Sequence, residues 1–197
     1  LAFGFTVWKR STEPATPEPS ASQGGTLMPG APDGSAPMAG SEVAPPADTD
    51  AGVVWTVPKI WLTQLTGGMR LATYIVPGAD AKSDAECAVY YFGPGQGGGM
   101  DANLERWAGE FEKPERKNVG HRKAGGIKIT TLEMRGTYSG HAMSQEQNTG
   151  PKTGWAMLGA IVEGPRGNVF FKLNGPAKTV AAATPAFNDM LGSFKVK

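Results

Sequence analysis

Hydrophobic and polar residues follow three successive patterns between Ala85 and Phe111. Both alternating sets of positions are apolar over 87–92, which predicts a strand covered on its two faces. A glycine-rich loop, 93–99, comes next. Asp101 then stands at a favourable N-cap position before apolar residues at helical spacing, Leu104, Trp107, Ala108 and Phe111. The pattern predicts a strand, a loop and a helix that form one unit.

Further apolar runs predict five more strands. Two of them, 53–57 and 69–76, precede this unit, and Pro58 ends the first as an edge strand. The alternation slips by one position within 127–134, which predicts a strand with a β-bulge near Thr130 and Thr131. The runs 155–162 and 169–173 are separated by a turn segment and predict a hairpin.

The C-terminal segment predicts a second amphipathic helix, with Pro176 in its first turn. Its apolar residues, three or four positions apart, are Val180, Ala183, Phe187, Leu191 and Phe194. Pro185 interrupts this pattern, so we expect a kink, or a restart of the helix with Thr184 as its cap. Two polar segments, 112–123 and 139–154, predict connections, and a loop as long as the second is often functional or disordered.

The predicted order is β-β-β-α-β-β-β-α. It favours an α+β fold in which an antiparallel sheet of about six strands is sandwiched by two helices. Motifs in 53–197 include Trp55-x-x-Pro58-x-x-Trp61, Tyr91-Phe-Gly-x-Gly-Gln-Gly-Gly and Phe170-Phe-Lys-Leu. They resemble an uncharacterised family of bacterial exported proteins whose element order is similar to the Mog1/PsbP-like α/β/α sandwich. The resemblance implies the fold and brings no catalytic residue with it.

Composition divides the chain near residue 52. Residues 11–50 contain no Lys or Arg and six acidic residues, and they are dominated by Pro, Ala, Ser, Gly and Thr. Such a segment buries too little apolar surface to offset the entropy of ordering it. Residues 51–197 hold 17 basic and 12 acidic residues, a net charge of +5. We therefore expect 1–52 to be an apolar remnant followed by a disordered linker, and 53–197 to be a single globular domain.

The first eight residues are mostly apolar and are followed by Lys9 and Arg10. They are too few to span a bilayer but are consistent with the remnant of a signal or anchor segment. An apolar start, a long linker and a compact domain are typical of tethered envelope proteins. We expect a periplasmic or cell-envelope location, with a membrane tether through the N-terminus, and keep a cytoplasmic location as the alternative.

The glycine loop is the first candidate for chemistry. Gly93, Gly95 and Gly98 satisfy G-x-G-x-x-G between a strand and a helix, where dinucleotide-binding loops hold a pyrophosphate. However, the order lacks a parallel βαβ unit, and Asp101 places negative charge where an anion would sit. We interpret the loop as a turn that needs a glycine backbone. Anion binding remains the alternative.

Other polar groups give no close-spaced ligand set. His121 and His141 are expected in polar loops and the single cysteine, Cys87, inside a strand, so we assign no metal site and no cofactor. Three glutamates are expected to face solvent, and no catalytic pair is assigned among them: Glu105, Glu110 and Glu133. The basic residues of 112–123 are not interleaved with aromatic residues, so nucleic acid is not expected as a partner.

These observations favour a non-enzymatic binding or accessory domain tethered in the cell envelope, acting on an unknown protein or small ligand. Two alternatives stay open: an enzyme-like domain that binds a small ligand or anion through 93–99, and a cytoplasmic adaptor. The candidate ligand or partner rim combines the glycine loop with the long polar loop and the residue before it. Its members are Gly95, Gln96, Gly97, Gly98, Tyr138, His141 and Asn148.

Overall fold

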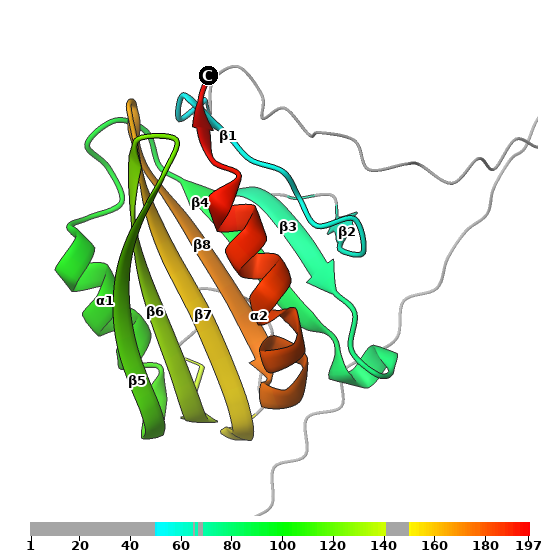
Figure 1. The fold of residues 1–197 in the computed structure, drawn as a ribbon. Coiled ribbons are helices and arrows are strands. Elements are labelled where there is room, and N and C mark those ends of the chain that lie inside the picture. The colour runs from blue at the N-terminus through cyan, green and yellow to red at the C-terminus, as the bar shows by residue number, and fades with distance from the viewer. Residues whose placement is uncertain (1–49, 65, 67–68, 141–149) are drawn as a thin grey trace, which may run out of the picture. The chain divides into compact units, whose positions relative to one another are not determined.

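The computed structural model describes residues 50–64, 66, 69–140 and 150–197, which include a seven-stranded antiparallel sheet with one α-helix on each face (Figure 1). The strands in spatial order are β2 (Leu62–Gln64), β3 (Arg70–Val76), β4 (Ala85–Tyr91), β8 (Gly167–Pro176), β7 (Lys152–Gly164), β6 (Ile127–Tyr138) and β5 (Phe111–Ala124). The helices are α1 (Met100–Ala108) and α2 (Ala177–Gly192). The predicted α+β sandwich is confirmed, with seven strands in its main sheet. The apolar remnant, His141 and Asn148 lie outside the described residues.

Short elements complete the domain. A 3₁₀ turn, η2 (Ala81–Ser83), joins β3 to β4. The strand expected at 53–57 is reduced to β1 (Val53–Val54), which pairs with β9 (Lys195–Val196) in a separate two-stranded sheet. The sequence pattern missed β2 because all three of its residues are exposed, so it has no apolar alternation.

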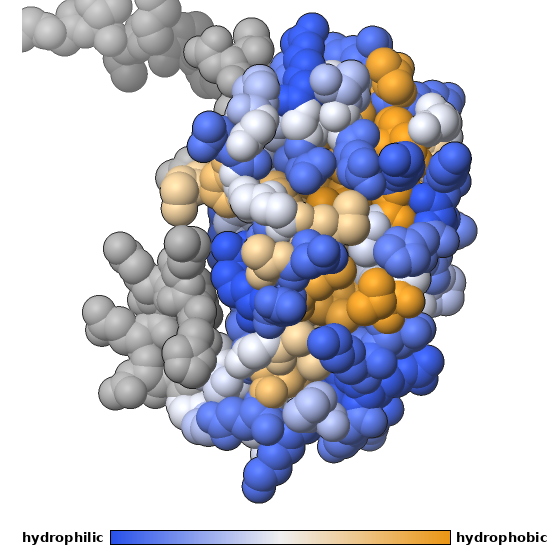
Figure 2. Space-filling view, turned by 90° about the vertical axis from the view of Figure 1, so that its left-hand side faces the viewer, coloured by the Kyte–Doolittle hydropathy of each residue, from blue (hydrophilic) through white to orange (hydrophobic). Residues whose placement is uncertain are grey.

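The expected polar connection 112–123 is wrong, because these residues belong to β5, a 14-residue strand at the edge of the sheet. Only Phe111 and Ala124, at the two ends of β5, are buried, and each joins one of the two hydrophobic clusters. Viewed from the side of α1 and β5, the surface is mostly hydrophilic with hydrophobic patches between (Figure 2). Lysines and arginines on an edge strand discourage pairing with another chain. The charges that made this segment look like a loop are therefore those that suit a sheet edge.

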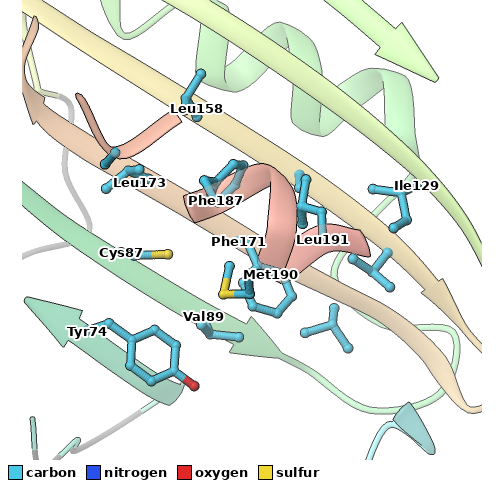
Figure 3. Packing of buried hydrophobic residues seen from close by; sticks show 14 of the residues in the cluster. Tyr74, Cys87, Val89, Ile129, Leu158, Phe171, Leu173, Phe187, Met190 and Leu191 are labelled. Carbon is cyan, nitrogen blue, oxygen red and sulfur yellow. The ribbon is translucent and has the colours of Figure 1, made fainter. Parts of the chain in front are cut away.

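The main core lies between the sheet and α2 (Figure 3). Phe187, Met190 and Leu191 of α2 pack on the strands beneath, among them β8, whose Phe171 and Leu173 are fully buried. Cys87 of β4 is also fully buried here, and this burial raises the pKa of its thiol. A second cluster on the opposite face contains Trp107, and the strands are therefore apolar on both faces.

The predicted bulge at Thr130 and Thr131 is wrong, since β6 pairs with both neighbours there without a shift of register. Ile127 and Ile129 join the core under α2, whereas Leu132 and Met134 join the cluster under α1. The slip in alternation arises because the two ends of one regular strand are covered on opposite faces. Register shifts instead occur near Lys113, Arg116 and Tyr138.

Helix α1 is shorter than the apolar stripe predicted. Its N-cap is Gly99, not Asp101, which lies in the first turn. The helix ends at Ala108 with Gly109 as its C-cap, and Phe111 begins β5 while still contributing to the cluster of Trp107. The predicted stripe therefore names residues that pack in this cluster, of which Leu104 and Ala108 are partly buried, and its last member belongs to the next element.

Helix α2 runs from Ala177 to Gly192 without the restart expected at Pro185. A proline inside a helix costs about 3 kcal/mol because it removes one hydrogen bond and crowds the preceding turn. The buried face of α2 offsets this cost, since most of a helix's stability in a protein comes from packing. Thr184 does not cap a new helix, because its hydroxyl donates to the Val180 carbonyl at 2.9 Å.

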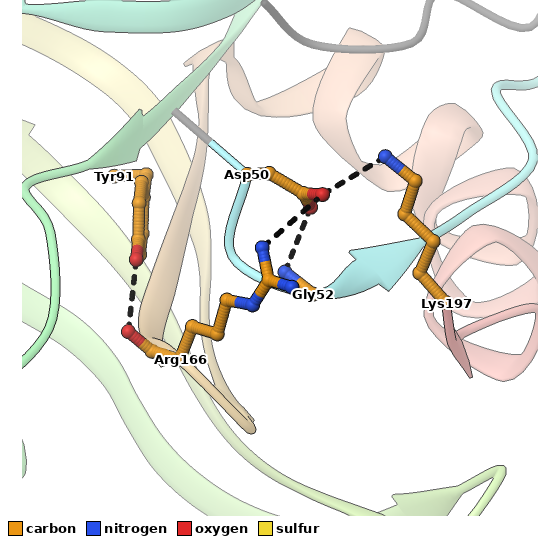
Figure 4. Close-up of polar contacts among 5 residues, drawn as sticks. All are labelled: Asp50, Gly52, Tyr91, Arg166 and Lys197. Carbon is orange, nitrogen blue, oxygen red and sulfur yellow. Dashed lines mark hydrogen bonds and ion pairs between the residues drawn. The ribbon is translucent and has the colours of Figure 1, made fainter. Parts of the chain in front are cut away.

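The start and the end of the described domain meet at Asp50 (Figure 4). Its carboxylate lies 2.9 Å from Lys197 Nζ and 3.5 Å from Arg166 Nη1, and it accepts a hydrogen bond from the Gly52 amide. The contact with Lys197 is the main cause of the lowered pKa of Asp50. On the other side of Arg166, the Tyr91 hydroxyl donates to the Arg166 carbonyl at 2.8 Å. One carboxylate thus joins three segments that are distant in sequence.

Candidate functional site

A groove of about 1140 Å³ lies on the face of the sheet that carries α1. Helix α1 has nine residues, and its Trp107 ring sits directly over Gly159 of β7. The groove includes residues of β3, β4 and β8 beside this contact, so it begins where the helix stops covering the sheet. We call it the α1 groove.

Small residues make the floor of the α1 groove low. In the register of the sheet, Lys172 of β8 stands between Ala88 of β4 and Gly159 of β7. Side chains that are direct neighbours across antiparallel strands lie on the same face of the sheet. Ala88 therefore leaves space on the β4 side of Lys172, whereas the Trp107 ring covers Gly159 on the β7 side.

Lys172 forms an ion pair with Glu110, the residue that follows the C-cap of α1. Their side chains are only 16% and 9% exposed, so both charges are largely removed from water. Burial lowers the pKa of Lys172, while the Glu110 carboxylate opposes that shift. The Glu110 carbonyl also accepts hydrogen bonds from the Ser139 amide at 2.8 Å and the Ser139 hydroxyl at 3.0 Å. The pair therefore links α1, β8 and the end of β6.

Two stacked aromatic pairs contribute to the walls. Tyr138 and Trp155 have ring centroids 5.6 Å apart, and Tyr90 and Phe92 have centroids 6.1 Å apart. Lys152 Nζ lies 4.4 Å from the centre of the Trp155 ring, within the range of a cation–π contact. Burial and the nearby Glu110 carboxylate raise the pKa of Tyr138, so its hydroxyl stays protonated at neutral pH.

More basic than acidic side chains line the groove. The basic ones are Arg70, Arg106, Lys152 and Lys172, against Asp84, Glu86 and Glu110. Arg70 is paired with Glu86 at 2.8 Å, and Arg106 donates to Asn103 Oδ1. Asn174 Oδ1 is buried in the groove wall, and a hydrogen bond with the Asn174 side chain lowers the pKa of the neighbouring Tyr138, against the larger rise that burial causes.

Four of the residues predicted as a rim line this groove: Gln96, Gly97, Gly98 and Tyr138. Gly95 belongs to the same loop but does not line the groove. His141 and Asn148 lie outside the described residues. The structure thus brings the described part of the glycine loop and Tyr138 to one hollow, although a role in binding stays a prediction.

Asn103 of α1 fixes the glycine loop. Its side-chain amide donates to the carbonyls of Gly97 and Gly99 at 2.9 and 2.8 Å. Gly97 has φ +88°, and a Cβ at this position would lie 2.7 Å from the Phe170 ring. The backbone of Gly97 therefore needs both a left-handed conformation and a close approach that only glycine allows.

Sequence reasoning missed the central pair. Glu110 was expected to face solvent, but the helix ends at Ala108 and Glu110 is paired with Lys172. The signal available was Lys172 itself, a lone charge inside the apolar run 169–173. Of the other glutamates, Glu105 is exposed as expected, and Glu133 pairs with Arg116 at 3.2 Å.

The histidine and membrane predictions concern other parts of the molecule. His121 lies in β5, not in a loop, and its Nδ1 is 3.1 Å from the Thr130 hydroxyl. Within the described ranges, no three His, Cys, Asp or Glu side chains come together in a way that would hold a metal ion. Of the helices described, neither has the length and apolar character needed to cross a membrane.

The arrangement of a seven-stranded antiparallel sheet between α1 and α2 is a PsbP-like fold. Among solved structures, the chain is similar to the solution structure of cyanobacterial PsbP (CyanoP) from Synechocystis sp. PCC 6803. The TM-score is 0.51 at 14% identity, and the match covers 83% of this chain and 98% of that one. This likeness shows the fold alone.

A second similar structure is the crystal structure of LpqN, described as involved in cell envelope biogenesis of Mycobacterium tuberculosis. Its TM-score is 0.47 at 12% identity, and the match covers 73% of this chain and 82% of that one. No family model matches the chain, and no curated protein matches it.

Proposed function

We propose that this chain is a binding or accessory domain whose ligand occupies the α1 groove. The observation that carries the proposal is the groove itself: about 1140 Å³, aromatic walls and a sequestered ion pair at its floor. Binding sites commonly combine a concave, largely apolar wall with a few converging polar groups. Four residues of the rim expected from the sequence line the groove and support the same location: Gln96, Gly97, Gly98 and Tyr138.

We further propose that the domain acts without catalysing a reaction. The two central ionisable groups, Lys172 and Glu110, are bonded to each other. Cys87 is sealed in the core on the opposite face of β4. The chemistry of the groove is therefore suited to holding a ligand rather than to transforming one.

A dye that fluoresces in apolar surroundings, 8-anilinonaphthalene-1-sulfonate, tests whether the groove binds ligands. We expect saturable binding of one dye per chain, which Ala88→Trp abolishes by filling the floor and Phe92→Ala weakens by removing part of a wall. Ala181→Trp is the matched control, because Ala181 is exposed on α2. Circular dichroism would check that each variant is folded. Equal dye binding by Ala88→Trp and Ala181→Trp would contradict the proposal.

We also propose that the domain is tethered in the cell envelope. The apolar start and the acidic, proline-rich 11–50 support this location, since a long polar linker lets a domain reach away from a membrane. Fractionation of cells that make the protein tests the proposal. Recovery with membranes or in the periplasm is expected, whereas recovery in the cytosol would favour the adaptor alternative.

A further inference from the structure

The hairpin of β5 and β6 carries most of the net positive charge of the domain. Residues 111–138 hold seven basic and three acidic side chains, a net charge of +4, whereas the rest of 51–197 has a net charge of only +1. We propose that the β5 edge of the sheet docks on a membrane surface, through the anionic headgroups of its lipids. This inference concerns a surface other than the α1 groove, and it rests on the proposed location in the cell envelope.

Arginines and lysines of this hairpin differ in what holds them. Each arginine is bound by a neighbour: Arg116 lies 3.2 Å from Glu133, Arg135 lies 3.6 Å from Glu115, and Arg122 donates to Asn188 at 3.1 Å. Three exposed lysines of β5 have no carboxylate within 4.0 Å in the described part of the chain: Lys113, Lys117 and Lys123. Lysine is a flexible point charge, whereas arginine suits fixed, two-pronged contacts. The charges left free therefore suit a fluid layer of phosphates better than one fixed anion.

Two of the hairpin's lysines stand opposite each other. Lys123 of β5 is the direct partner of Lys128 of β6 in the register of the sheet. Like charges at directly opposed positions destabilise a sheet. Glu163 comes within 4.0 Å of Lys128 but no closer. Protection of a sheet edge needs charge, but it does not need two lysines in opposition. A layer of anionic headgroups would relieve this repulsion.

Other classes of partner find little to bind on β5. Among the described residues of the hairpin, Val119 is the single large apolar side chain that is exposed, whereas the buried centre of a protein interface is apolar and poor in charge. Residues 112–123 include no aromatic ring on which a nucleic-acid base could stack. A strand of 14 residues is about 45 Å long, and it presents its lysines along a line that a flat charged surface can meet.

The chain enters the domain near the turn of this hairpin. The Gly52 carbonyl accepts a hydrogen bond from the Lys197 amide at 3.0 Å, and Gly125, in the turn between β5 and β6, packs against the backbone of Phe194. Figure 1 shows the hairpin turn and the C-terminus at the same end of the sheet. A linker to a membrane would therefore leave the domain at the end of β5 where Lys123 lies.

Sedimentation of the purified full chain with phospholipid vesicles tests the inference. Vesicles of phosphatidylcholine with about one third phosphatidylglycerol should bind the chain, and vesicles of phosphatidylcholine alone should not. Because each lysine near an anionic surface contributes about fivefold to partitioning, the triple variant Lys113→Gln, Lys117→Gln, Lys123→Gln should lower the partition coefficient by about a hundredfold. Binding should also weaken as salt is added, since ions screen these charges.

A matched triple variant removes the same total charge from other elements. Its changes are Lys59→Gln, Lys82→Gln and Lys178→Gln, all at exposed lysines outside the hairpin. This control should keep most of the binding, and circular dichroism would check that both variants are folded. Both retain residues 1–49, so binding through that segment would not separate them. Equal partition coefficients for the two variants, or binding that salt leaves unchanged, would overturn the inference.

Two further probes distinguish the source of the anion. Tighter binding of a DNA duplex than of the anionic vesicles, at equal phosphate concentration, would overturn the membrane assignment in favour of nucleic acid. Release from the vesicles by inorganic phosphate, beyond that caused by chloride at equal ionic strength, would overturn it in favour of a site for a single phosphate. The envelope location is tested separately: recovery in the cytosol with intact vesicle binding would overturn the location alone, and recovery with membranes without vesicle binding would overturn only the β5 surface.

Discussion

Replacing Trp107 by alanine is the most direct test of how α1 is held on the sheet. The Trp107 side chain is 4% exposed, it meets the Phe170 ring edge-on at 6.4 Å, and it lies over Gly159. A tryptophan buries about 200 Å², which at about 25 cal/mol per Å² gives an upper limit of about 5 kcal/mol. Truncation of a buried aromatic ring typically costs about 3–5 kcal/mol.

Because Trp107 borders the groove, we expect its truncation to cost an amount at the lower end of the range of about 3–5 kcal/mol. Trp107 also lines the α1 groove, so the space left by truncation joins a hollow that water can enter. The penalty for an empty cavity is then smaller, and we expect Trp107→Ala to lower the free energy of unfolding by about 3 kcal/mol.

Urea unfolding followed by circular dichroism measures this change. The midpoint should fall while the slope stays constant, because the same surface is exposed on unfolding. Glu105→Ala, on the exposed side of the same helix, should change stability by less than about 0.5 kcal/mol. If Trp107→Ala cost as little as this control, the packing of α1 through Trp107 would be refuted.

Three further predictions use other parts of the domain. Gly97→Ala should destabilise the domain more than Gly95→Ala, because a Cβ at 97 meets Phe170 whereas one at 95 meets nothing within 4 Å. Thermal melts of the two variants test this, and equal losses of melting temperature would contradict it. Asp50→Asn should lower the melting temperature at neutral pH. The folded-state pKa of Asp50 lies below 3.8, so the difference in melting temperature between the variant and the unmodified chain should shrink as the pH falls below 3.8 and through that lower pKa. A difference in melting temperature that persists in acid would contradict this. A chain that begins at residue 50 should melt within about 4 °C of the full chain, and a larger drop would show that 1–49 stabilise the domain.

The sequence predicted the layers of the fold because both faces of the inner strands are apolar. Runs such as 155–162 and 169–173 need cover on two sides, and two amphipathic helices can provide it. It failed at the margins, where that signal is absent. Strand β5 is the outer strand of the sheet, and most of its residues are exposed and polar, so its composition resembles that of a loop.

The site was only half predictable for a related reason. The glycine loop is visible in the sequence, and the structure brings Gln96 and Gly97 to the groove. The floor depends on register, since the pairing of β4 with β8 places the small side chain of Ala88 beside Lys172. Ala88 and Lys172 are 84 residues apart, and pairing between strands so distant in sequence leaves no trace in local periodicity. Glu110, expected to face solvent, is instead buried because the helix ends at Ala108, two positions before it.

The pairing of β1 with β9 has a mechanical consequence. Val53 is opposite Val196 and Val54 is opposite Lys195, so the two ends of the domain leave this small sheet side by side. A force that pulls those ends apart would peel the pairs open one after another instead of shearing them all at once. Under load, this two-stranded sheet and the contacts of Asp50 would yield first, while the seven-stranded sheet, which the force does not reach until later, keeps the groove intact.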